Sequence, residues 1–387
     1  MDRILLVRLG ALGDIIHALP VAAALRDAFP SARIDWLVSA KHRAILDCVP
    51  VIDRRLVLER PASAEKRSPR RRFYDEADEP VGGRGAWRRI ALAIGELRES
   101  DYDIAFDLQG LIKSAVLARS SGARRVVGFP TTHLRERWAH VFYSETCEPP
   151  AGVHVTDKNL ALLGAVGLHN VAKRFPLEAK DSDAVADVRK SVGGARFALM
   201  NPGAGWPNKR WPPEWFASLA DKLRTARGIE TVVLWGPGEE TLARHVVEVS
   251  RDAARLAPQT EVADIIGLSR AAAVFISGDT GPLHIAAAVG TPVVGIYGPT
   301  NAARNGPWHP SDESVSRYAE CRCHYRRRCR LETCCLLDIT VDQVMAAVER
   351  RLAIAEGGQP LGPSDLRGSA SPPRPEPVEG RTFGPSE

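Results

Sequence analysis

Short apolar runs of strand length alternate with longer helical patterns along almost the whole chain, and this alternation constrains the fold more than any other feature. Strands and helices in regular alternation form parallel sheets that are covered by helices on both faces. We expect an α/β fold with about nine or ten strands, divided between two doubly wound units rather than placed in one large sheet. The strands are expected at Ile4–Val7, Ile34–Val38, Arg55–Leu58, Ile104–Leu108, Arg125–Gly128, Phe197–Asn201, Thr231–Trp235, Ala273–Ser277 and Pro292–Tyr297.

Helical patterns separate these strands and suggest where the chain divides. A helix at Asp157–Gly167 and the stretch Lys173–Asp183 form the expected joint between an N-terminal domain, residues 1–172, and a C-terminal domain, residues 173–355. A chain of 387 residues is long enough for two domains that each bury a core. The other helices are expected at Gly13–Ala28, Trp87–Glu99, Glu214–Arg227, Pro282–Val289 and Val341–Ala355.

Two segments depart from this regular pattern. Residues 60–85 hold a run of lysines and arginines, then acidic residues, with several prolines and glycines, which predicts a mobile insertion. Residues 356–387 are rich in Pro and Gly and almost lack large apolar side chains, which predicts a disordered tail.

Composition narrows the classes of function. Hydrophobic residues make up 44% of the chain and charged residues 26%, as in an ordinary globular protein. No apolar run could span a bilayer, and Met1–Arg8 lacks the features of a signal peptide, so we expect a cytoplasmic protein. The net charge of +5 does not indicate nucleic-acid binding, although it suits contact with an anionic membrane surface.

The first polar motif, Arg8–Asp14, follows the first expected strand and opens a helix. Gly10 and Gly13 allow a sharp turn and a close backbone approach to a ligand at this strand end. The spacing is not GxGxxG, which disfavours a dinucleotide site. Asp14 is expected either to cap the helix or to act as a catalytic base, and these roles are compatible.

The second motif, Asp107–Ser114, also lies at a strand end and opens a helix. Its Asp, Gln and Lys side chains could line one wall of a cleft. The simpler interpretation is a turn that carries a solvated Lys113, and the motif by itself favours that interpretation.

Two further motifs lie in the second half of the chain. The loop Asn201–Pro212 has small residues for close backbone approach, and Lys209 could balance a phosphate charge. The stretch Ser277–His284 places the N–H groups of Thr280 and Gly281 at a helix start, where an anion can bind. His284 would either face that anion or simply fill space.

Five of the seven cysteines cluster near the C-terminus. Their spacing does not fit a zinc finger, and the arginines between them disfavour a cation site. We expect thiols that pack in a loop and no bound metal. The five are Cys321, Cys323, Cys329, Cys334 and Cys335.

Together these motifs resemble those of the bacterial heptosyltransferases of lipopolysaccharide core synthesis, glycosyltransferase family 9. The stretch Leu12–Pro20 resembles the N-terminal signature of the family, and Asp107–Ser114 and Gly278–His284 resemble two others, in the same order and at similar spacing. The likeness covers about residues 1–355. Leu108–Leu111 and Val153–Asp157 look closer to heptosyltransferase I than to II.

The resemblance implies a GT-B fold, in which two Rossmann-like domains face each other across a cleft. The N-terminal domain would bind the acceptor and the C-terminal domain the nucleotide sugar. The reaction would be an inverting transfer of heptose from ADP-heptose to the Kdo or heptose inner core of lipopolysaccharide, such as Kdo-lipid A. No cofactor or metal would be required, and stimulation by a divalent cation is left open.

The resemblance also assigns roles to single residues. Asp14 would be the general base that accepts the proton of the acceptor hydroxyl. The acceptor would be bound by Arg8, Gly13 and Lys113. The donor would be bound by Lys209, Glu239, Asp279, Thr280, Gly281 and His284, with Glu239 on the adenosine ribose. Ala204 and Gly205 replace hydroxyl residues found in some relatives, which leaves the donor contacts less defined.

Other functions remain as alternatives. A GT-B transferase with another nucleotide-sugar donor, or a sugar-nucleotide epimerase, would keep the fold and the phosphate site without needing Asp14 as a base. A nucleotide-binding module without catalysis is disfavoured because Asp14, Lys113 and Asp279 occur together. An enzyme of this class would work at the inner face of the inner membrane, where the basic insertion could meet anionic lipid, although such charge runs are usually just solvated.

Overall fold

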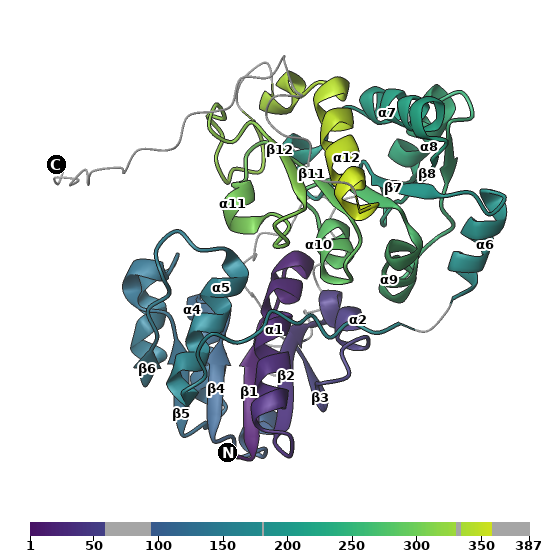
Figure 1. Ribbon diagram of the computed structural model, residues 1–387. Helices are drawn as coiled ribbons and strands as arrows, with labels where there is room; N and C mark the ends of the chain where they lie inside the picture. The colour runs from purple at the N-terminus through teal and green to yellow at the C-terminus, as the bar shows by residue number, and fades with distance from the viewer. Residues whose placement is uncertain (59–93, 180–181, 330–333, 358–387) are drawn as a thin grey trace, which may run out of the picture.

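The computed structural model describes residues 1–58, 94–179, 182–329 and 334–357, which form two parallel β-sheets (Figure 1). The first sheet has the order β3-β2-β1-β4-β5-β6 and the second the order β12-β11-β10-β7-β8-β9. Counted along the chain, both are the strand order of a Rossmann fold. The predicted α/β fold with two doubly wound units is therefore confirmed. The strands are β1 (Arg3–Val7), β2 (Arg33–Ser39), β3 (Arg54–Leu58), β4 (Ile104–Asp107), β5 (Arg125–Gly128), β6 (Glu145–Thr146), β7 (Phe197–Asn201), β8 (Glu230–Val233), β9 (Ala254–Leu256), β10 (Val274–Gly278), β11 (Val293–Tyr297) and β12 (Glu313–Ser316).

Helices cover the sheets and connect successive strands (Figure 1). The N-terminal domain has α1 (Leu12–Ala28), α2 (Arg43–Leu46), α4 (Ile112–Ser120) and α5 (Val155–Leu160). The C-terminal domain has α6 (Asp183–Ser191), α7 (Pro213–Arg227), α8 (Glu240–Val249), α9 (Val262–Ala271), α10 (Gly281–Ala288), α11 (Ala302–Asn305) and α12 (Val341–Ala355). Short 3₁₀ helices are η1 (Ala40–His42), η3 (Thr131–His133), η4 (Arg137–Phe142), η5 (Ala161–Val166), η6 (Pro207–Lys209) and η7 (Cys335–Asp338).

Several predictions fall on residues that the structure does not describe. Only the end of the predicted helix Trp87–Glu99 is described, where residues 94–98 are helical. The insertion at residues 60–85 and nearly all of the predicted tail lie outside the described residues. The predicted helix Asp157–Gly167 is divided between α5 and η5.

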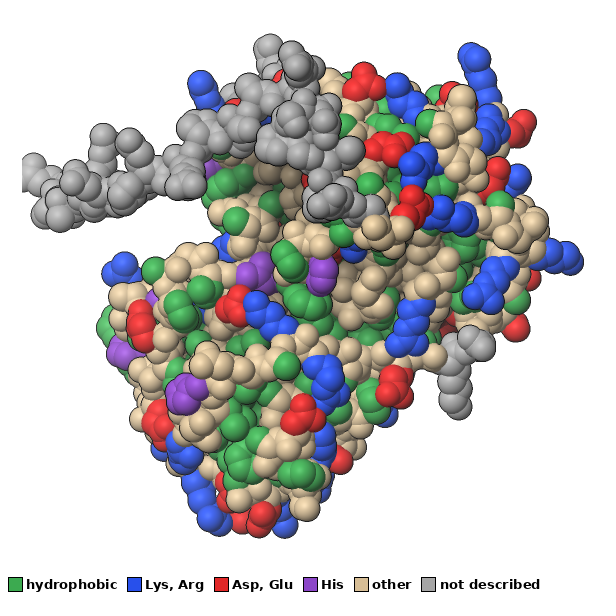
Figure 2. Space-filling view, in the orientation of Figure 1, with side chains coloured by type: hydrophobic (Ala, Val, Ile, Leu, Met, Phe, Trp, Pro, Cys, Tyr) green, Lys and Arg blue, Asp and Glu red, His purple; other side chains and the backbone are tan. Residues whose placement is uncertain are grey.

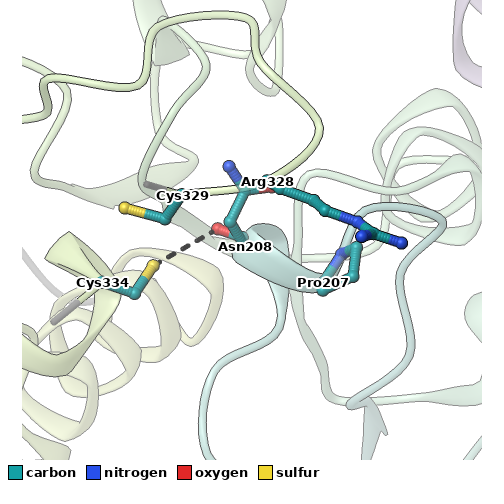
Figure 3. A pocket seen from close by; sticks show the side chains of 5 residues that line it. All are labelled: Pro207, Asn208, Arg328, Cys329 and Cys334. Carbon is teal, nitrogen blue, oxygen red and sulfur yellow. Dashed lines mark hydrogen bonds between the residues drawn. The ribbon is translucent and has the colours of Figure 1, made fainter. Parts of the chain in front are cut away.

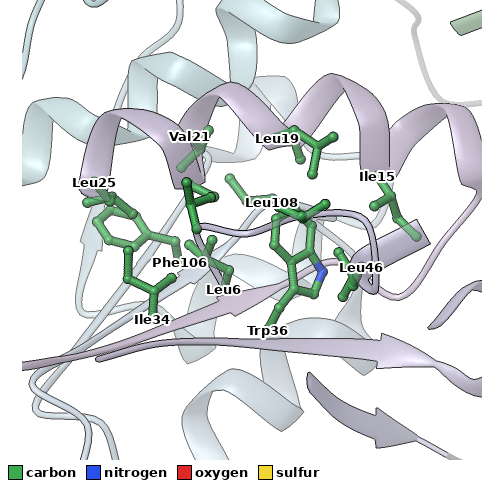
Figure 4. Packing of buried hydrophobic residues seen from close by; sticks show 14 of the residues in the cluster. Leu6, Ile15, Leu19, Val21, Leu25, Ile34, Trp36, Leu46, Phe106 and Leu108 are labelled. Atoms are coloured by element: carbon green, nitrogen blue, oxygen red, sulfur yellow. The ribbon is translucent and has the colours of Figure 1, made fainter. Parts of the chain in front are cut away.

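Helix α1 is buried on every side through its middle, which explains why its sequence is not amphipathic. Every residue from Ile15 to Leu25 is buried. One side packs on the first sheet, where Trp36 and Phe106 fill the space beneath the helix (Figure 4). A helix that is apolar all round must be covered on its other sides as well. Helices α5 and α10 provide that cover.

The contact between α1 and α10 joins the two domains. A Cβ atom added at Gly13 would lie 2.4 Å from Cδ2 of His284, and one added at Gly281 would lie 2.6 Å from Cδ2 of Leu12. Glycine at these two positions therefore lets the helix starts approach closely. Ile285 of α10 and Ile266 of α9 are fully buried in the apolar cluster of the N-terminal domain.

The joint between the domains has no helix or strand from residue 167 to residue 179. Leu177 is buried against the N-terminal core, and its carbonyl accepts a 2.6 Å hydrogen bond from Arg270 of α9. The exact domain boundary at residue 172 stays a prediction.

Candidate functional site

Asp14 lies in the first turn of α1, at the carboxyl end of β1. Its Oδ2 atom accepts a hydrogen bond from the Ala11 N–H at 3.2 Å and pairs with Arg8 Nη2 at 2.7 Å. The Asp14 side chain is 38% exposed, and both of these interactions use Oδ2 and leave Oδ1 without a hydrogen bond or ion pair from the described residues. Asp14 therefore caps the helix through one oxygen and still presents the other for chemistry, so the two expected roles are compatible in the structure.

The second motif supports the loop that carries Arg8 and Asp14. Arg8 Nη1 donates to the Leu108 carbonyl, and the Leu9 N–H donates to Gln109 Oε1 at 2.8 Å. Trp36 donates its indole N–H to the Arg8 carbonyl at 3.1 Å. These bonds connect the ends of the neighbouring strands β1 and β4. The arginine that was predicted to bind acceptor thus also positions the predicted base.

Asp107 organises the second motif from a fully buried position. Its carboxylate accepts hydrogen bonds from Tyr143 at 2.8 Å, Ser114 at 2.9 Å, and the N–H groups of Gln109 at 2.9 Å and Gly110 at 3.1 Å. Burial raises the pKa of Asp107, while these hydrogen bonds offset part of the shift. Lys113, in the first turn of α4, is exposed at the same edge of the sheet.

Lys209, Asp279 and His284 form a buried ionic group in the C-terminal domain. Lys209 Nζ lies 2.7 Å from Asp279 Oδ2, and His284 Nε2 lies 3.1 Å from Oδ1. Burial alone would raise the pKa of Asp279, but the hydrogen bond to His284 and the Lys209 charge hold it well below its usual range. The Lys209 ammonium also lies over the Trp206 ring, 4.4 Å from the centroid.

The start of α10 provides an anion site beside this ionic group. Thr280 is the residue before the first turn, and its hydroxyl contacts Asn201 Nδ2 at 3.3 Å and Ser277 Oγ at 3.1 Å. The N–H groups of a first helical turn have no acceptor within the helix. Those of Thr280 and Gly281 lie at this helix start, which is suited to an anion, and their binding of phosphate oxygens stays a prediction.

Glu239 lies on the other side of the Lys209 loop, directly before α8. It packs so closely on Gly203 that a Cβ atom there would lie 2.1 Å from Glu239 Oε2. Arg210 Nη2 lies 3.5 Å from the carboxylate. Burial raises the pKa of Glu239, and the Arg210 charge opposes that shift. The structure thus places Glu239 between β8 and α8, against Gly203 of the Asn201–Pro212 loop, and its contact with the ribose stays a prediction.

The contact between α1 and α10 brings the two sets of predicted residues together. Gly13 touches His284, and Asp14 is the next residue along α1. The base candidate of one domain is therefore adjacent to the ionic group of the other. In each sheet, the site lies where strand order reverses, at the ends of β1 and β4 and of β7 and β10, as expected of ligand sites in doubly wound sheets.

Comparison with known proteins identifies the family. The family model of glycosyltransferase family 9 (heptosyltransferase) matches residues 90–335. The chain belongs to this family. It is similar to lipopolysaccharide heptosyltransferase 1 of Pseudomonas aeruginosa, with 27% identity over 84% of this chain and 87% of the relative. It is also similar to the lipopolysaccharide core heptosyltransferase OpsX of Haemophilus influenzae, with 23% identity over 81% and 84% of the two chains.

Solved structures share the fold. A glycosyltransferase of family 9 from Veillonella parvula superposes with a TM-score of 0.72 at 21% identity, over 91% of this chain and 97% of that one. The Escherichia coli heptosyltransferase WaaC with ADP gives a TM-score of 0.67 at 21% identity, over 91% and 99%. This glycosyltransferase therefore has the GT-B fold that the resemblance implied.

Three histidines meet at the domain contact, and the sequence analysis gave no role to two of them, His17 and His154. The His17 ring lies 4.5 Å from the His284 ring and 5.0 Å from the His154 ring, centroid to centroid. Histidine side chains gather where the two halves meet (Figure 2). Burial lowers the pKa of His17 well below its ordinary value, and His284 and His154 lower it further. His17 lies in the stretch Leu12–Pro20, so its place in that motif was the available signal.

The cysteine-rich segment packs behind the Lys209 loop. Cys334 Sγ lies 3.7 Å from the Asn208 carbonyl, and Cys323 Sγ lies 3.1 Å from Cys329 Sγ. A shallow pocket of about 410 Å³ opens here (Figure 3). Within the described residues, no three His, Cys, Asp or Glu side chains are arranged to hold a metal. The pocket is lined by Pro207, Asn208, Arg328, Cys329 and Cys334.

No helix in the described part of the chain has the length and apolar character needed to cross a membrane.

Proposed function

We propose that this glycosyltransferase transfers a heptose from ADP-heptose to the Kdo or heptose inner core of lipopolysaccharide, with inversion at the anomeric carbon. The proposal is supported by the family description and by relatives named lipopolysaccharide heptosyltransferase 1. A related structure of the E. coli enzyme contains ADP-2-deoxy-2-fluoro heptose. The similarity to type 1 enzymes agrees with the resemblance of the short motifs to heptosyltransferase I.

One observation supports this chemistry more than any other: Asp14 adjoins the Lys209–Asp279–His284 group at the contact between α1 and α10. A single displacement needs a base on one side of the anomeric carbon and charge stabilisation on the other. The N-terminal domain supplies a partly exposed carboxylate. The C-terminal domain supplies a cation and free first-turn N–H groups.

In the proposed reaction, Asp14 accepts the proton of the acceptor hydroxyl while the oxygen of that hydroxyl bonds to the anomeric carbon. The bond from that carbon to ADP breaks, and its electron pair leaves with the terminal phosphate. Lys209 and the N–H groups of Thr280 and Gly281 stabilise the charge that develops there. Asp279 holds Lys209 in place and can accept a hydrogen bond from a sugar hydroxyl.

The remaining predicted residues take binding roles. Glu239 is proposed to accept hydrogen bonds from the ribose, and His284 to orient Asp279 beside the phosphates. On the acceptor side, Arg8 both positions Asp14 and faces acidic acceptor groups, with Lys113 at the neighbouring strand end. Gly13 allows the helix starts to approach. The protein is proposed to require no metal and to work in the cytoplasm, at the inner face of the inner membrane.

The decisive experiment separates the capping role of Asp14 from its role as a base. ADP release from ADP-heptose is measured with and without Kdo-lipid A for the wild type and for Asp14→Asn. Asparagine also caps helices, so the fold should persist. We expect acceptor-dependent release to fall by at least about a hundredfold, the usual size of a general-base effect, while ADP binding is retained.

Asp264 provides a matched control, because its Oδ2 atom accepts a 2.7 Å hydrogen bond from the Glu261 N–H in the first turn of α9. Asp264→Asn changes a first-turn aspartate that caps its helix in the same way as Asp14, but at a distance from the proposed chemistry. It should leave turnover within about twofold of the wild type, as for an exposed surface change. An Asp14→Asn enzyme that retains turnover would reject the general-base assignment.

A further inference from the structure

Lys158 occupies an unusual place on α5, beside the N-terminal half of α1. The side chain is half-buried. Its ammonium donates a 2.7 Å hydrogen bond to the His133 carbonyl and lies 4.4 Å from the centroid of the Phe129 ring. Both partners belong to the loop after β5, at the same edge of the sheet as the Arg8–Asp14 loop. Lys158 therefore lies beside the acceptor half of the site.

No described carboxylate pairs with Lys158. The adjacent Asp157 pairs instead with Lys173, at 2.8 Å. Burial, together with the nearby positive charges of Arg304 and Arg8, lowers the pKa of Lys158 to about 8. A half-buried ammonium beside two other cations is destabilising unless an anion balances it.

Arg304 reaches this place from the other domain. His154, one helical turn before Lys158, makes a 2.9 Å hydrogen bond through Nε2 to the Gly306 carbonyl at the end of α11. Residues four apart lie on one face of a helix. Arg304, two residues before Gly306, belongs to the segment that meets the start of α5 across the domain contact, and its charge acts on Lys158. Its own polar partner is the neutral Asn305 side chain, at 3.0 Å, and no described carboxylate pairs with it.

Arg8 connects this pair of cations to the proposed base. It is close enough to affect the charge of Lys158, and its Nη2 atom lies 2.7 Å from Asp14 Oδ2. Arg8 is already neutralised by Asp14, whereas Lys158 and Arg304 are not neutralised by any described carboxylate. An anion between Lys158 and Arg304 would lie near the hydroxyl that Asp14 deprotonates.

We propose that Lys158 and Arg304 together bind one anionic group of the acceptor, a carboxylate or a phosphate, and so connect the two domains through the substrate. The identity of the acceptor rests on the proposed function, whereas the anion site rests on these side chains. Because each domain contributes one cation, the site is complete only when the domains are together. Acceptor binding would therefore favour the closed arrangement in which Asp14 faces the donor.

The first test measures acceptor dependence in the full-length protein for Lys158→Gln, Arg304→Gln and the charge-retaining Lys158→Arg. Loss of a charge-assisted contact should raise the KM for acceptor by about tenfold or more, with the KM for donor unchanged. Lys158→Arg should remain within about threefold of the wild type, because the positive charge is kept. The matched control is Lys222→Gln, since Lys222 pairs with Asp342 on the surface of the C-terminal domain.

Two altered acceptors identify the anionic group. One has its sugar carboxylates converted to neutral amides, and the other has its lipid phosphates removed. With the wild type, the acceptor that lacks the bound anion should show the same rise in KM that Lys158→Gln causes with the intact acceptor. With Lys158→Gln, removing that anion should raise the KM no further. If Lys158→Gln impairs both neutral acceptors as much as the intact one, or behaves like Lys222→Gln, the proposal is wrong.

A binding measurement tests the site even if no heptose is transferred. With ADP saturating, inorganic phosphate should raise the melting temperature of the wild type and of Lys222→Gln, but not of Lys158→Gln or Arg304→Gln. A wild type that releases no ADP from ADP-heptose would refute the proposed function and leave the phosphate result to decide the anion site. Absence of a phosphate effect in the wild type, or an equal effect in all variants, would overturn the site.

Discussion

Asp279 is a buried carboxylate, 9% exposed, that pairs with the Lys209 ammonium through one oxygen and contacts His284 Nε2 through the other. A buried carboxylate is costly unless it is paired and hydrogen-bonded, and each Asp279 oxygen has one such partner. The arrangement keeps Asp279 ionised and also holds Lys209 at the place where we expect the donor phosphate to bind. Stability and donor binding therefore depend on the same side chain.

Asp279→Asn should weaken ADP binding by about tenfold or more and lower the melting temperature, because it leaves the buried Lys209 ammonium without its carboxylate. Since the pKa of folded Asp279 is depressed, its stabilisation is fully present above the unfolded pKa of about 4 and is lost as pH falls through the lower folded value. The difference in melting temperature between wild type and variant should persist from neutral pH to about pH 4 and shrink only in stronger acid.

Thermal melts between neutral pH and about pH 3 measure this difference. The control is Asp221→Asn, which removes an exposed carboxylate that lies 3.4 Å from Arg224. It should change the melting temperature little at any pH, because exposed pairs contribute little. A difference for Asp279→Asn that disappears at or above pH of about 5 would contradict the depressed pKa.

His17 should make the domain contact sensitive to acid. Its pKa is lowered mainly by burial and by His284 and His154, while Asp279 opposes the shift and Arg8 adds to it. An unfolded histidine has a pKa of about 6.5, so below that pH the unfolded state binds more protons than the folded state. Stability should fall by up to about 1.4 kcal/mol per pH unit as pH decreases from about 6.5 toward the folded pKa. Above about pH 6.5, His17 should have no effect on the pH dependence of stability.

His17→Gln should therefore reduce the loss of melting temperature between about pH 6.5 and pH 5, even if it lowers the value at pH 7. The comparison is with His140→Gln, since His140 is exposed. An acid sensitivity that stays the same in His17→Gln would show that other groups, such as His154, dominate the titration.

At the scale of elements, the close approach of α1 and α10 depends on glycine. Gly13→Ala would place a methyl group 2.4 Å from Cδ2 of His284, so the buried His284 ring or one of the two helices must shift. A shift of about 1 Å between reacting groups can cost up to about a hundredfold in rate. We expect kcat/KM to fall by about tenfold or more, with each domain still folded.

Gly164→Ala is the matched control, because its Cβ would meet His169 at 3.4 Å, which is an ordinary contact. Kinetics, together with circular dichroism, separate the loss of activity from loss of fold. Wild-type kinetics in Gly13→Ala would mean that the helices are not in this contact during catalysis.

Strands were predictable where a buried apolar run ends at Gly, Pro or Asn. Arg125–Gly128 and Phe197–Asn201 were expected with the bounds that the structure has. The missed strands β6, β9 and β12 are two to four residues long, and none is wholly buried, so they carry no apolar signal. Each lies at an edge of its sheet and pairs with a single neighbouring strand, which sets its position.

Local motifs predicted the candidate donor residues but not the contacts between segments that lie far apart in the sequence. The Lys209–Asp279 pair joins residues 70 positions apart, and sequence spacing does not indicate that they meet. The same is true of His17 and His284, whose rings lie 4.5 Å apart across the domain contact. The sequence indicated their importance only through the motifs that contain them, Leu12–Pro20 and Ser277–His284. The pairing of their faces depends on how two folded domains pack, which local patterns do not encode.

At the scale of the whole molecule, the two sheets repeat one strand order and bring their carboxyl ends to a common contact. The apolar cluster of the N-terminal domain includes Ile266 and Ile285 of the C-terminal domain, both fully buried. The joint also packs on this cluster through Leu177. The domains therefore share part of one core, and we expect the protein to unfold in a single calorimetric transition.

Replacing both Ile266 and Ile285 with alanine should separate that transition into two. Each Ile→Ala change should lower the free energy of unfolding by about 2–5 kcal/mol. Here the loss weakens the contact between the domains. Ile229→Ala is the control, because Ile229 is equally buried but lies inside the C-terminal core. It should lower the midpoint without separating the peaks. Because Asp14 adjoins the Lys209–Asp279–His284 group only while the domains are joined, the double variant should also lose transfer activity while keeping ADP affinity. A single transition in the double variant, with activity intact, would mean that the substrates rather than this apolar contact hold the domains together.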